Sequence, residues 1–391
     1  MRVIYPDPHA IPDRATVPLN ILQNVDALGE IGVKVDLVTP KPVSNIGSEK
    51  ILGRKLNINV AAHQLHDFRR KWYFPSSSNK PFYVMVGRWI QKRKADAIIL
   101  RNLKLAAHLL TLKGLPPMFF ELHEVFAETY SENHQSRNFI QKRKLMKLQE
   151  QERAVYTNAC GLIATTNGIA TDLIKIYSVS SPIAVLPNGV DFHLASIAHS
   201  VKPNAVPVLL YLGNLHPWKG VDVLLQAMCL ITGAVLHIAG GSHDQIMQLT
   251  EIANSLGVGE KVKFLGSIEP LDRFGQIASS DICLLPSTTT AMGGRYTSPL
   301  KLFEYLAMGK PVITSDLPAM REVLQHGQNA WLVKPNDPAS LAEGIHMLLS
   351  NLQLRATLGS AAAACAKNFT LVGRATKIEA FVQANLARLK K

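Results

Sequence analysis

Three short segments of the sequence combine residue types that could bind a phosphate, a sugar hydroxyl or a proton. The first, residues 213–220 (GNLHPWKG), stands between the strand-like run VLLYL and the helical run VDVLLQAM. A glycine-containing turn from strand to helix offers free backbone N–H groups and the positive end of a helix dipole to an anion. Lys219 adds a full positive charge. A phosphate site and a simple turn with a solvated lysine fit this segment equally well.

The second segment, residues 298–311 (SPLKLFEYLAMGKP), predicts a short helix that carries a carboxylate among apolar positions. Pro299 suits its first turn, and its buried stripe would consist of Leu300, Phe303 and Leu306. Glu304 falls between these positions, where an ionised carboxylate is costly unless hydroxyls or a cation pair with it. A vicinal diol such as that of ribose is a fitting partner. An ordinary salt bridge with Lys301 is the alternative.

The third segment is the strand-like run MFFEL, which leads directly into His123 and Glu124. A histidine at the carboxyl end of a strand in an open parallel sheet points into the crevice where ligands bind. A histidine with a purely structural role is the commoner case, so the spacing alone leaves both interpretations open.

Other phosphate-binding and metal-binding patterns do not accompany these segments. The sequence has neither a Walker loop nor a GxGxxG turn, and no Asp-x-Asp pair stands in a suitable loop. The cysteines are scattered without CxxC or Cys/His spacing. We therefore expect no metal site, no obligatory metal cofactor, and reduced cysteines in the core at Cys160, Cys229, Cys283 and Cys365.

Short apolar, β-branched runs alternate with longer amphipathic stretches along the chain, which predicts an α/β protein built from βα units with parallel sheets. Helices are expected near residues 17–30, 103–112, 140–158 and 169–177. The expected strands are residues 3–5, 34–38, 97–100, 118–122, 161–165, 183–186, 208–212, 235–239, 262–265, 282–285, 312–314 and 330–333.

A Pro-Asn-Gly turn at residues 187–189 precedes a stretch without periodicity, so we place a domain junction there. The chain of 391 residues then forms an N-terminal domain of residues 1–187 and a C-terminal domain of residues 188–370. Open α/β sheets bind ligands outside the carboxyl ends of their strands. A cleft between two doubly wound domains is therefore the expected active site.

Positive charge is concentrated in the N-terminal half, where residues 1–187 hold 25 Lys and Arg against 15 Asp and Glu. It gathers at residues 68–72 (FRRKW), 86–94 (VGRWIQKRK) and 141–147 (QKRKLMK). Such segments suit an anionic membrane surface, and a solvated basic face is the alternative. No nucleic-acid signature accompanies them, so nucleic acid is not an expected partner. Without a spanning or secretory segment, the expected location is cytoplasmic, peripheral to the membrane's inner face.

Taken together, these segments resemble the retaining GT-B glycosyltransferases of family 4, the glycosyl transferases group 1 type. PNGVD, the GxLxxxKG pattern, HIAGG, KVKFLG and the SPLKLFEYLAMGKPVI block occur in family order between residues 187 and 313. The N-terminal half is matched by layout and a few residues. The resemblance implies two Rossmann-like domains facing across a cleft, with residues 371–391 similar to the C-terminal helix that crosses back onto the first domain.

The resemblance also implies residue roles. Lys219 would bind the donor diphosphate, Glu304 would hold the nucleotide ribose, and His123 would face the donor sugar. The backbone at Thr297 and Ser298 would approach the donor's phosphate and sugar. Neighbouring positions of the two motifs complete the expected donor-binding set: Gly213, Asn214, Arg295, Tyr296, Pro299, Leu300 and Lys301.

The chain departs from the family pattern at three places. Asn214 stands where the family usually has an arginine, and we hypothesise that Arg295 replaces that cation. Tyr296 stands where the first glutamate of the usual EX7E pair would be, so recognition of the donor sugar through that position cannot be carried over. The first βα loop, YPDPHAIPDRATVP, lacks the glycines common in relatives.

The implied reaction moves a sugar from a UDP- or GDP-sugar to an acceptor hydroxyl with retention of configuration. The acceptor would be a glycan or a lipid-linked molecule, as in surface polysaccharide biosynthesis. Fixed cations and helix-end amides would stabilise the leaving diphosphate without an obligatory metal. Two alternatives stay open: a nucleotide-sugar epimerase of the same architecture, and a catalytically inactive protein that assembles at the membrane surface.

Overall fold

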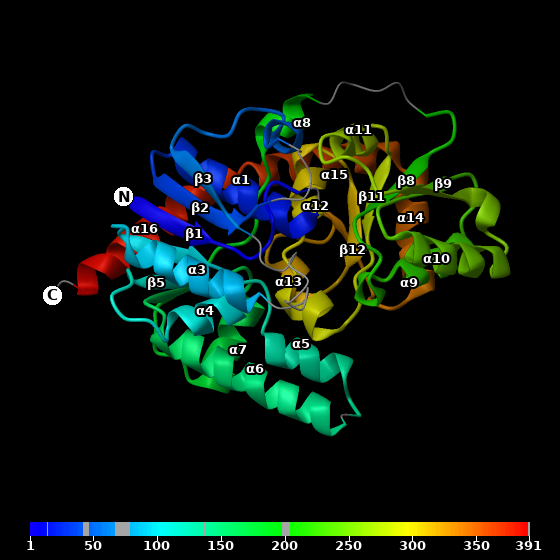
Figure 1. The fold of residues 1–391 in the computed structure, drawn as a ribbon. Coiled ribbons are helices and arrows are strands. Elements are labelled where there is room, and N and C mark those ends of the chain that lie inside the picture. Colours follow the sequence, from blue (N-terminus) through cyan, green and yellow to red (C-terminus); the bar gives the residue numbers. More distant parts are fainter. Residues whose placement is uncertain (14, 42–46, 67–78, 137, 198–203, 390–391) are drawn as a thin grey trace. The chain divides into compact units, whose positions relative to one another are not determined.

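The computed structural model describes the chain except for residues 14, 42–46, 67–78, 137, 198–203 and 390–391. The chain divides into two compact units (Figure 1). Unit 1 comprises Met1–Pro187 together with Leu371–Lys391, and unit 2 comprises Asn188–Thr370. Each unit is a parallel sheet with helices on both faces, which confirms the predicted pair of doubly wound, Rossmann-like folds.

The sheet of unit 1 has seven strands in the order β3-β2-β1-β4-β5-β6-β7. The chain leaves β1 toward one edge and returns at β4, so the strand order reverses between them. The described elements are β1 (Arg2–Pro6), α1 (Thr16–Glu30), β2 (Lys34–Pro40), α2 (Glu49–Leu52), β3 (Val60–Leu65), α3 (Lys80–Gln91), β4 (Ala97–Leu100), α4 (Leu103–Leu109), β5 (Met118–Leu122), α5 (Phe126–Asn133), α6 (Phe139–Asn158), β6 (Gly161–Ala164), α7 (Asn167–Tyr177), β7 (Ile183–Val185) and α16 (Leu371–Leu389).

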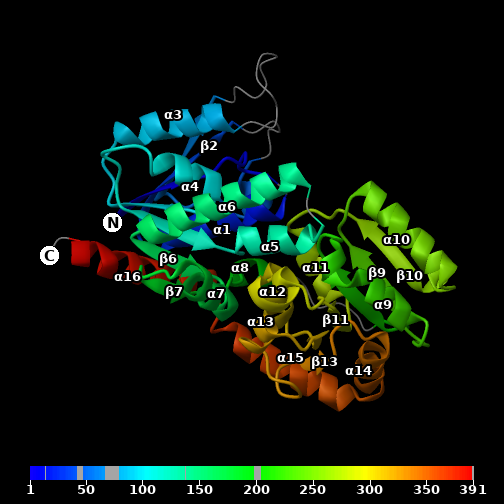
Figure 2. The ribbon, with the colours of Figure 1, turned by 90° about the horizontal axis from the view of Figure 1, so that it is seen from below.

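Helix α16 belongs to the core of unit 1, although it is the last helix of the chain. It packs against α1 (Figure 2), and the apolar side chains of Leu371, Ala375, Ile378 and Val382 join the same buried cluster as Val3 and Val35 of the sheet. Because side chains alternate along a strand, Val3 and Val35 point to the same face of the sheet, where α16 packs. One face of this sheet is therefore covered by helices from the two ends of the chain.

The sheet of unit 2 has six strands in the order β10-β9-β8-β11-β12-β13, which reverses between β8 and β11. The described elements are α8 (Phe192–Ile197), β8 (Val208–Leu212), the 3-10 turn η2 (Pro217–Lys219), α9 (Val221–Met228), β9 (Val235–Ala239), α10 (His243–Ser255), the 3-10 turn η3 (Gly259–Lys261), β10 (Val262–Gly266), α11 (Asp272–Ala278), β11 (Ile282–Leu285), the π-helical turn η4 (Ala291–Tyr296), α12 (Leu300–Ala307), β12 (Val312–Ser315), α13 (Pro318–Arg321), β13 (Trp331–Val333), α14 (Pro338–Ser350) and α15 (Leu352–Ala366).

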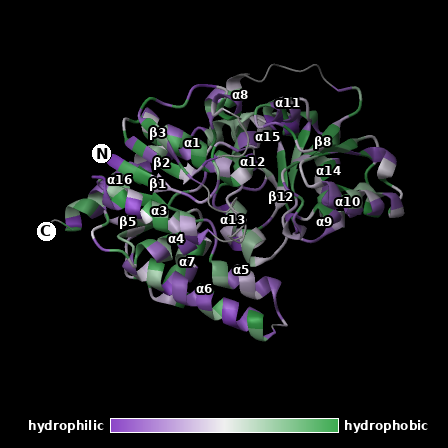
Figure 3. Cartoon of the chain, viewed as in Figure 1, coloured by the Kyte–Doolittle hydropathy of each residue, from purple (hydrophilic) through white to green (hydrophobic). Residues whose placement is uncertain are grey.

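Neighbouring residues of the central strands in unit 2 enter two different cores. Leu209 and Tyr211 of β8 pack with α9 and α14, whereas Leu210 packs with α12 and α15. Strands buried on both faces show as continuous hydrophobic stretches (Figure 3). The apolar runs in the sequence are long enough to predict strands because neither face is exposed to water.

Four described elements of unit 1 are absent from the sequence prediction, namely α2, β3, α3 and α5. Strand β3 is an edge strand on which only Val60 is buried, so it lacks an apolar run. Helix α3 begins at Lys80, inside a polar stretch, and α5 is a short helix with one buried residue, Ala127. Helix α3 does have an apolar face, with Phe82, Val86 and Ile90 buried at helical spacing, so periodicity indicates it once the polar start is set aside. The others are too short or too exposed to show a periodic pattern.

The cysteine prediction is partly wrong. All four are free thiols, but only Cys283 is buried, Cys160 and Cys365 are half-buried, and Cys229 is exposed. Cys229 is the residue after α9, where the chain turns outward after the buried Met228. Within the described residues, no helix is both long and apolar enough to cross a membrane, and no group of His, Cys, Asp and Glu side chains is arranged to hold a metal ion.

Candidate active site

The glycine turn of unit 2 lies where the strand order reverses, between the ends of β8 and β11. Gly213 has a φ of 134° and Gly220 a φ of 69°. A Cβ on Gly220 would lie 1.8 Å from the carbonyl oxygen of Pro286, which follows β11. The amide of Thr288 also donates to the carbonyl of Trp218 at 3.0 Å. The two loops therefore touch through their backbones, which only glycine at position 220 permits.

Lys219 is buried at the end of η2, directly before α9. Its side chain is 9% exposed, and its Nζ lies 3.6 Å from the centroid of the Trp218 ring. Burial lowers the pKa of Lys219 to about 7, because no water solvates the charged form. With this pKa, the amine of Lys219 is only partly protonated at neutral pH. A bound anion would favour its protonated form.

Lys301 is a second buried cation beside the glycine turn. Its Nζ lies 3.6 Å from the centroid of the Tyr211 ring and 3.2 Å from where a Cβ on Gly213 would stand. It has no hydrogen-bond partner in the described structure. Burial, and then the charge of Lys219, hold the pKa of Lys301 well below its usual range. The lysine sits against a glycine, and its ammonium group is left without an acceptor.

Glu304 forms an ion pair with Arg273 of α11, not with Lys301. The Nε of Arg273 lies 2.7 Å from Oε1 of Glu304, and their side chains are 6% and 7% exposed. The salt bridge with Lys301 that the helix spacing allows is therefore absent. The three guanidinium nitrogens of Arg273 have no partner with hydrogen-bond geometry. Buried N–H groups left in this state carry a desolvation penalty that a ligand's oxygen atoms would relieve.

The loop before α12 is tied to the PNGVD turn. The backbone amide of Asn188 donates to Oγ of Ser298 at 3.0 Å, and its Nδ2 donates to the Ser298 carbonyl at 2.6 Å. Thr297 is buried, whereas Arg295 is exposed, with its guanidinium 5.1 Å from the ring centroid of Tyr296. Two motifs far apart in sequence thus hold each other in place within unit 2.

His123 belongs to unit 1, where it is part of a buried polar chain. Its Nε2 lies 3.0 Å from Oε1 of Glu121, and the same carboxylate accepts from Arg374 of α16 at 2.8 Å. Burial, followed by the nearby charge of Arg101, lowers the pKa of His123 to about 4. The imidazole is therefore neutral at physiological pH, and Glu121 accepts the proton on Nε2.

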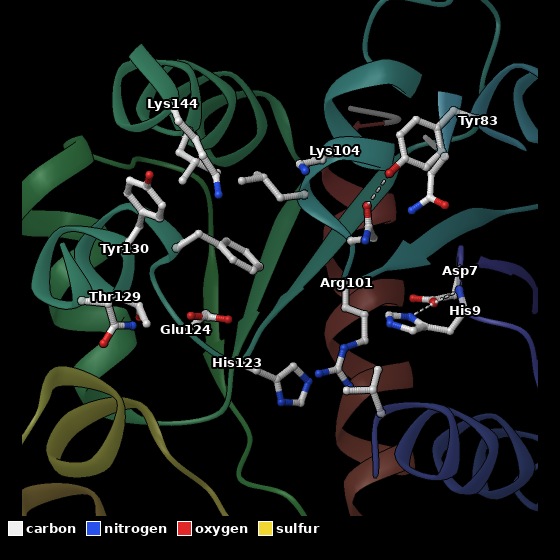
Figure 4. A pocket seen from close by; sticks show the side chains of 17 residues that line it. Asp7, His9, Tyr83, Arg101, Lys104, His123, Glu124, Thr129, Tyr130 and Lys144 are labelled. Carbon is white, nitrogen blue, oxygen red and sulfur yellow. Dashed lines mark hydrogen bonds and ion pairs between the residues drawn. The ribbon is translucent and has the colours of Figure 1, made fainter. Parts of the chain in front are cut away.

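His123 lines a pocket of about 520 Å³ in unit 1 (Figure 4). The pocket lies where the strand order reverses, because Asp7 follows β1 and Arg101 follows β4. Glu124 also lines it, and burial raises the pKa of that carboxyl group. In Figure 4 His9 contacts Asp7, with Nδ1 and Oδ1 2.6 Å apart. The glycine-free first loop thus contributes two side chains to the pocket.

Family models match both halves of the chain. The model described as Glycosyltransferase Family 4 matches residues 21–194, and that described as Glycosyl transferases group 1 matches residues 206–351. The two matches follow each other in the order of the two units. The chain belongs to the family 4, group 1 glycosyltransferases.

Among curated members of this family, a phosphatidyl-myo-inositol mannosyltransferase of Mycobacterium leprae is 30% identical over 50% of this chain and 52% of its own length. A D-inositol 3-phosphate glycosyltransferase of Corynebacterium diphtheriae is 25% identical over 58% and 57%. The matched stretches thus span about half of each relative. Solved structures share the fold: a sucrose-phosphate synthase of Thermosynechococcus elongatus covers 99% of both chains with a TM-score of 0.82 at 19% identity, and HepE of Anabaena, solved with UDP, covers 98% of this chain and 100% of its own with a TM-score of 0.73 at 20% identity.

This family 4 chain replaces the usual arginine by Asn214, and the structure leaves that position exposed. The backbone carbonyl of Asn214 accepts from the hydroxyl of Tyr211 at 2.8 Å, which holds the turn without a cation. Tyr296, at the position of the usual first glutamate, is fully buried. Neither residue presents a charge, so the cations of the turn are Lys219 and Lys301.

The sequence analysis predicted some residues of the candidate site in unit 2 and of the His123 pocket in unit 1, but it missed others. Unit 2 brings Gly213, Lys219, Lys301 and Glu304 together, whereas Arg295 lies exposed on a neighbouring turn. The missed residue is Arg273, whose only sequence signal was that a carboxylate in an apolar helix needs a partner. In unit 1 the missed residues follow strands β1 and β4, the position at which a strand reversal would have indicated them: Asp7, His9 and Arg101.

Proposed function

We propose that the protein is a retaining glycosyltransferase that moves a sugar from a UDP- or GDP-sugar to an acceptor hydroxyl. The observation that supports this proposal most strongly is the group of buried cations beside the glycine turn of unit 2. Burial lowers the pKa values of Lys219 and Lys301, and the charge of Lys219 lowers that of Lys301 further against a smaller opposing effect of Glu304. A diphosphate supplies the missing negative charge, and family membership supplies the reaction class.

In this proposal the cations stabilise the leaving group. Negative charge develops on the diphosphate as the sugar acquires oxocarbenium character, and preorganised positive groups lower that barrier. Lys219 and the N–H groups at the start of α9 face one side of the charge. Lys301 takes the place of the arginine that Asn214 lacks, in preference to the exposed Arg295. The leaving phosphate helps to deprotonate the acceptor, so no protein nucleophile is required.

Glu304 holds the ribose hydroxyls in the proposed complex. The carboxylate accepts hydrogen bonds from a vicinal diol on one side while Arg273 neutralises its charge on the other. The pocket around His123 in unit 1 takes the acceptor's reacting hydroxyl or the donor sugar. Its neutral imidazole serves as a hydrogen-bonding group without adding positive charge.

Calorimetric titration with UDP, GDP and their sugars tests the donor site. We expect the wild-type protein to bind one of the two diphosphates, and Lys219→Met and Lys301→Met to weaken that binding about tenfold or more, because each removes a charge-assisted contact. Methionine fits an apolar niche of similar volume, so both variants should stay folded. Lys367→Met, at an exposed lysine after α15, is the matched control and should bind as the wild type does.

Two results would redirect the proposal. Loss of activity in Arg295→Ala with normal Lys301→Met would return the second cation to Arg295. Absence of binding to any nucleotide would favour the inactive assembly protein. An epimerase would convert the sugar without releasing free UDP or GDP, whereas a transferase releases the diphosphate only when an acceptor is present.

We also propose that the start of α6 contacts an anionic membrane. Phe139, Ile140 and Met146 are 80%, 76% and 60% exposed, and they alternate with the exposed cations Lys142 and Arg143. Apolar side chains among cations favour the interface of an anionic bilayer. The segment at residues 68–72 lies outside the described residues. That at 86–94 is less suited, because Arg93 and His63 cover the ring of Trp89.

Sedimentation with vesicles tests the membrane contact. The wild-type protein should bind vesicles containing phosphatidylglycerol more strongly than pure phosphatidylcholine vesicles. Phe139→Ser/Ile140→Ser should lose most of that binding, whereas Met347→Ser/Leu352→Ser, at exposed apolar positions of unit 2, should not. Equal binding by both double variants, or none by the wild type at low salt, would refute the contact.

A further inference from the structure

A second cavity of unit 1 adjoins the His123 pocket and carries an unusual set of charges. It has a volume of about 620 Å³ and lies among α3, α4 and α6. Its described lining includes Lys80, Lys104, Lys144 and Lys147 but no Asp or Glu. We call it the lysine pocket. Four ammonium groups around one cavity repel one another, and an anion placed there would relieve that repulsion.

The lysines come from three elements that the fold brings together. Lys80 begins α3 and Lys104 lies in the first turn of α4. Lys144 and Lys147 are one helical turn apart on α6, so both lie on the same side of that helix, which packs against α4. The Nζ of Lys144 lies 4.7 Å from the centroid of the Tyr130 ring, a contact that keeps this cation at the mouth of the His123 pocket.

A histidine, His108, also lines the lysine pocket. Nε2 of His108 is shielded from water and has no hydrogen-bond partner in the described structure. Burial lowers the pKa of His108, so the ring is neutral and can donate one hydrogen bond. The neutral ring of His108 is therefore part of the pocket wall without adding a further positive charge.

The lysine pocket and the His123 pocket share five lining residues, among them Tyr83, Lys104 and Lys144. Figure 4 shows Lys104 and Lys144 at the far end of the His123 pocket from His123. A single molecule can therefore extend from one pocket into the other. The end in the lysine pocket would be anionic, and the end near His123 would carry the reacting hydroxyl.

We propose that the lysine pocket binds a phosphoryl group of the acceptor, so that the acceptor is a phosphate ester or diphosphate ester of a hydroxylated molecule. This inference rests on the proposed glycosyl transfer and specifies its acceptor class. Phosphate suits the site because lysines bind it as point charges from several directions, without the planar geometry that a carboxylate and an arginine share. The same chemistry occurs on a soluble sugar or polyol phosphate and on a lipid headgroup.

The test measures binding of glycerol 3-phosphate in solution, and of vesicles with and without phosphatidic acid, in three proteins. These are the wild type, Lys80→Ala/Lys147→Ala, and the control Lys113→Ala/Lys175→Ala. Lys113 follows α4 and Lys175 lies on α7, both are exposed, and neither lines the His123 pocket or the lysine pocket, so the control removes the same charge from unit 1. Both variants change exposed residues and should fold normally.

We expect the pocket variant to bind the phosphoryl probe about tenfold more weakly than the wild type and the control. Binding of glycerol 3-phosphate identifies a soluble acceptor. Binding to phosphatidic acid vesicles that the control keeps and the pocket variant loses, without binding of glycerol 3-phosphate, identifies a lipid headgroup. Equal weakening in both double variants, or no binding of either probe, overturns the inference. UDP and GDP binding is measured in the same samples: if it persists while the phosphoryl probes fail, the acceptor subsite is wrong and the donor site stands.

Discussion

At the scale of single residues, the candidate site in unit 2 contains buried cations whose charge an anion would compensate. In a protein interior, an ammonium group without an acceptor loses its proton more readily. Lys219, with a pKa of about 7, and Lys301 are both in this condition. Nucleotide binding should consequently involve a proton as well as a diphosphate.

We predict proton uptake on nucleotide binding above pH 7. The diphosphate raises the pKa of Lys219, so the ligand-free protein must take up a proton between about pH 7 and the higher pKa of the complex. Affinity should fall as pH rises through this range, by at most about tenfold per pH unit for one proton. Below pH 7 Lys219 is already charged and its contribution disappears.

Calorimetry at pH 8.5 in two buffers of different ionisation enthalpy measures this uptake. The apparent binding enthalpy should differ between the buffers at pH 8.5, and by less at pH 6.5. Equal enthalpies at pH 8.5 would show that both lysines are already protonated in the free protein, contrary to their burial.

The stability of the ligand-free protein should change with pH in the opposite direction from the nucleotide affinity. The unfolded chain keeps Lys219 protonated up to its ordinary pKa near 10.5, whereas the folded protein loses that proton at about 7. Because the unfolded state binds more protons between these values, this group's contribution to the free energy of unfolding increases as pH rises from 7.

At the scale of elements, the glycine turn depends on the close approach of two loops. We predict that Gly220→Ala destabilises the protein by about 1–3 kcal/mol more than Gly257→Ala. Both glycines have a φ near 70°, so both substitutions carry the same backbone penalty of about 1 kcal/mol. Only at Gly220 would the new Cβ meet the carbonyl of Pro286, because nothing lies within 4 Å at Gly257.

Denaturant unfolding of the two variants measures the difference, and nucleotide titration should show weaker binding for Gly220→Ala alone. Equal destabilisation by Gly220→Ala and Gly257→Ala would mean that the loop after β11 can move away from the new Cβ without a loss of stability. The position of Lys219 would then not depend on that contact.

The elements that the sequence predicted are those whose signal is local. Strands such as β4 and β11 are continuous apolar runs buried on both faces, and the start and end of α12 follow from Pro299 and Gly309. Strand β3 could not be predicted, because it is held by its neighbour β2 at the sheet edge rather than by its own apolar content.

The candidate sites divide in the same way. Lys219, Glu304 and His123 stand beside turn or strand signals, which made them visible in the sequence. Arg273 is visible only once α11 is packed beside α12, since 31 residues separate it from Glu304. The lysine pocket likewise combines three helices, and no single segment indicates it.

At the scale of the whole molecule, the two units differ in how the chain enters them. Unit 2 is one continuous segment, whereas unit 1 needs α16 from the opposite end of the chain. Arg374 on α16 donates to Glu121 at 2.8 Å and to Asn24 at 2.7 Å, all within the core of unit 1. Removing α16 would leave the buried carboxylate of Glu121 without its arginine and expose an apolar face.

We predict that residues 188–370 fold alone and bind the nucleotide diphosphate, whereas residues 1–187 do not reach a native state. Circular dichroism and calorimetry of both fragments measure this. A peptide of residues 371–391 should restore structure to the 1–187 fragment, and the same peptide with Arg374→Met should restore much less. A stable 1–187 fragment that ignores the peptide would contradict the role of α16.

The placement of α16 also sets the order in which the protein can mature on the ribosome. The strands of the first sheet are translated before unit 2, but the helix that covers one of their faces is translated after it. The first unit must therefore wait, with an apolar surface uncovered, while the second unit is made and folds. During synthesis unit 1 therefore keeps apolar surface uncovered for longer than unit 2, and this exposure favours aggregation.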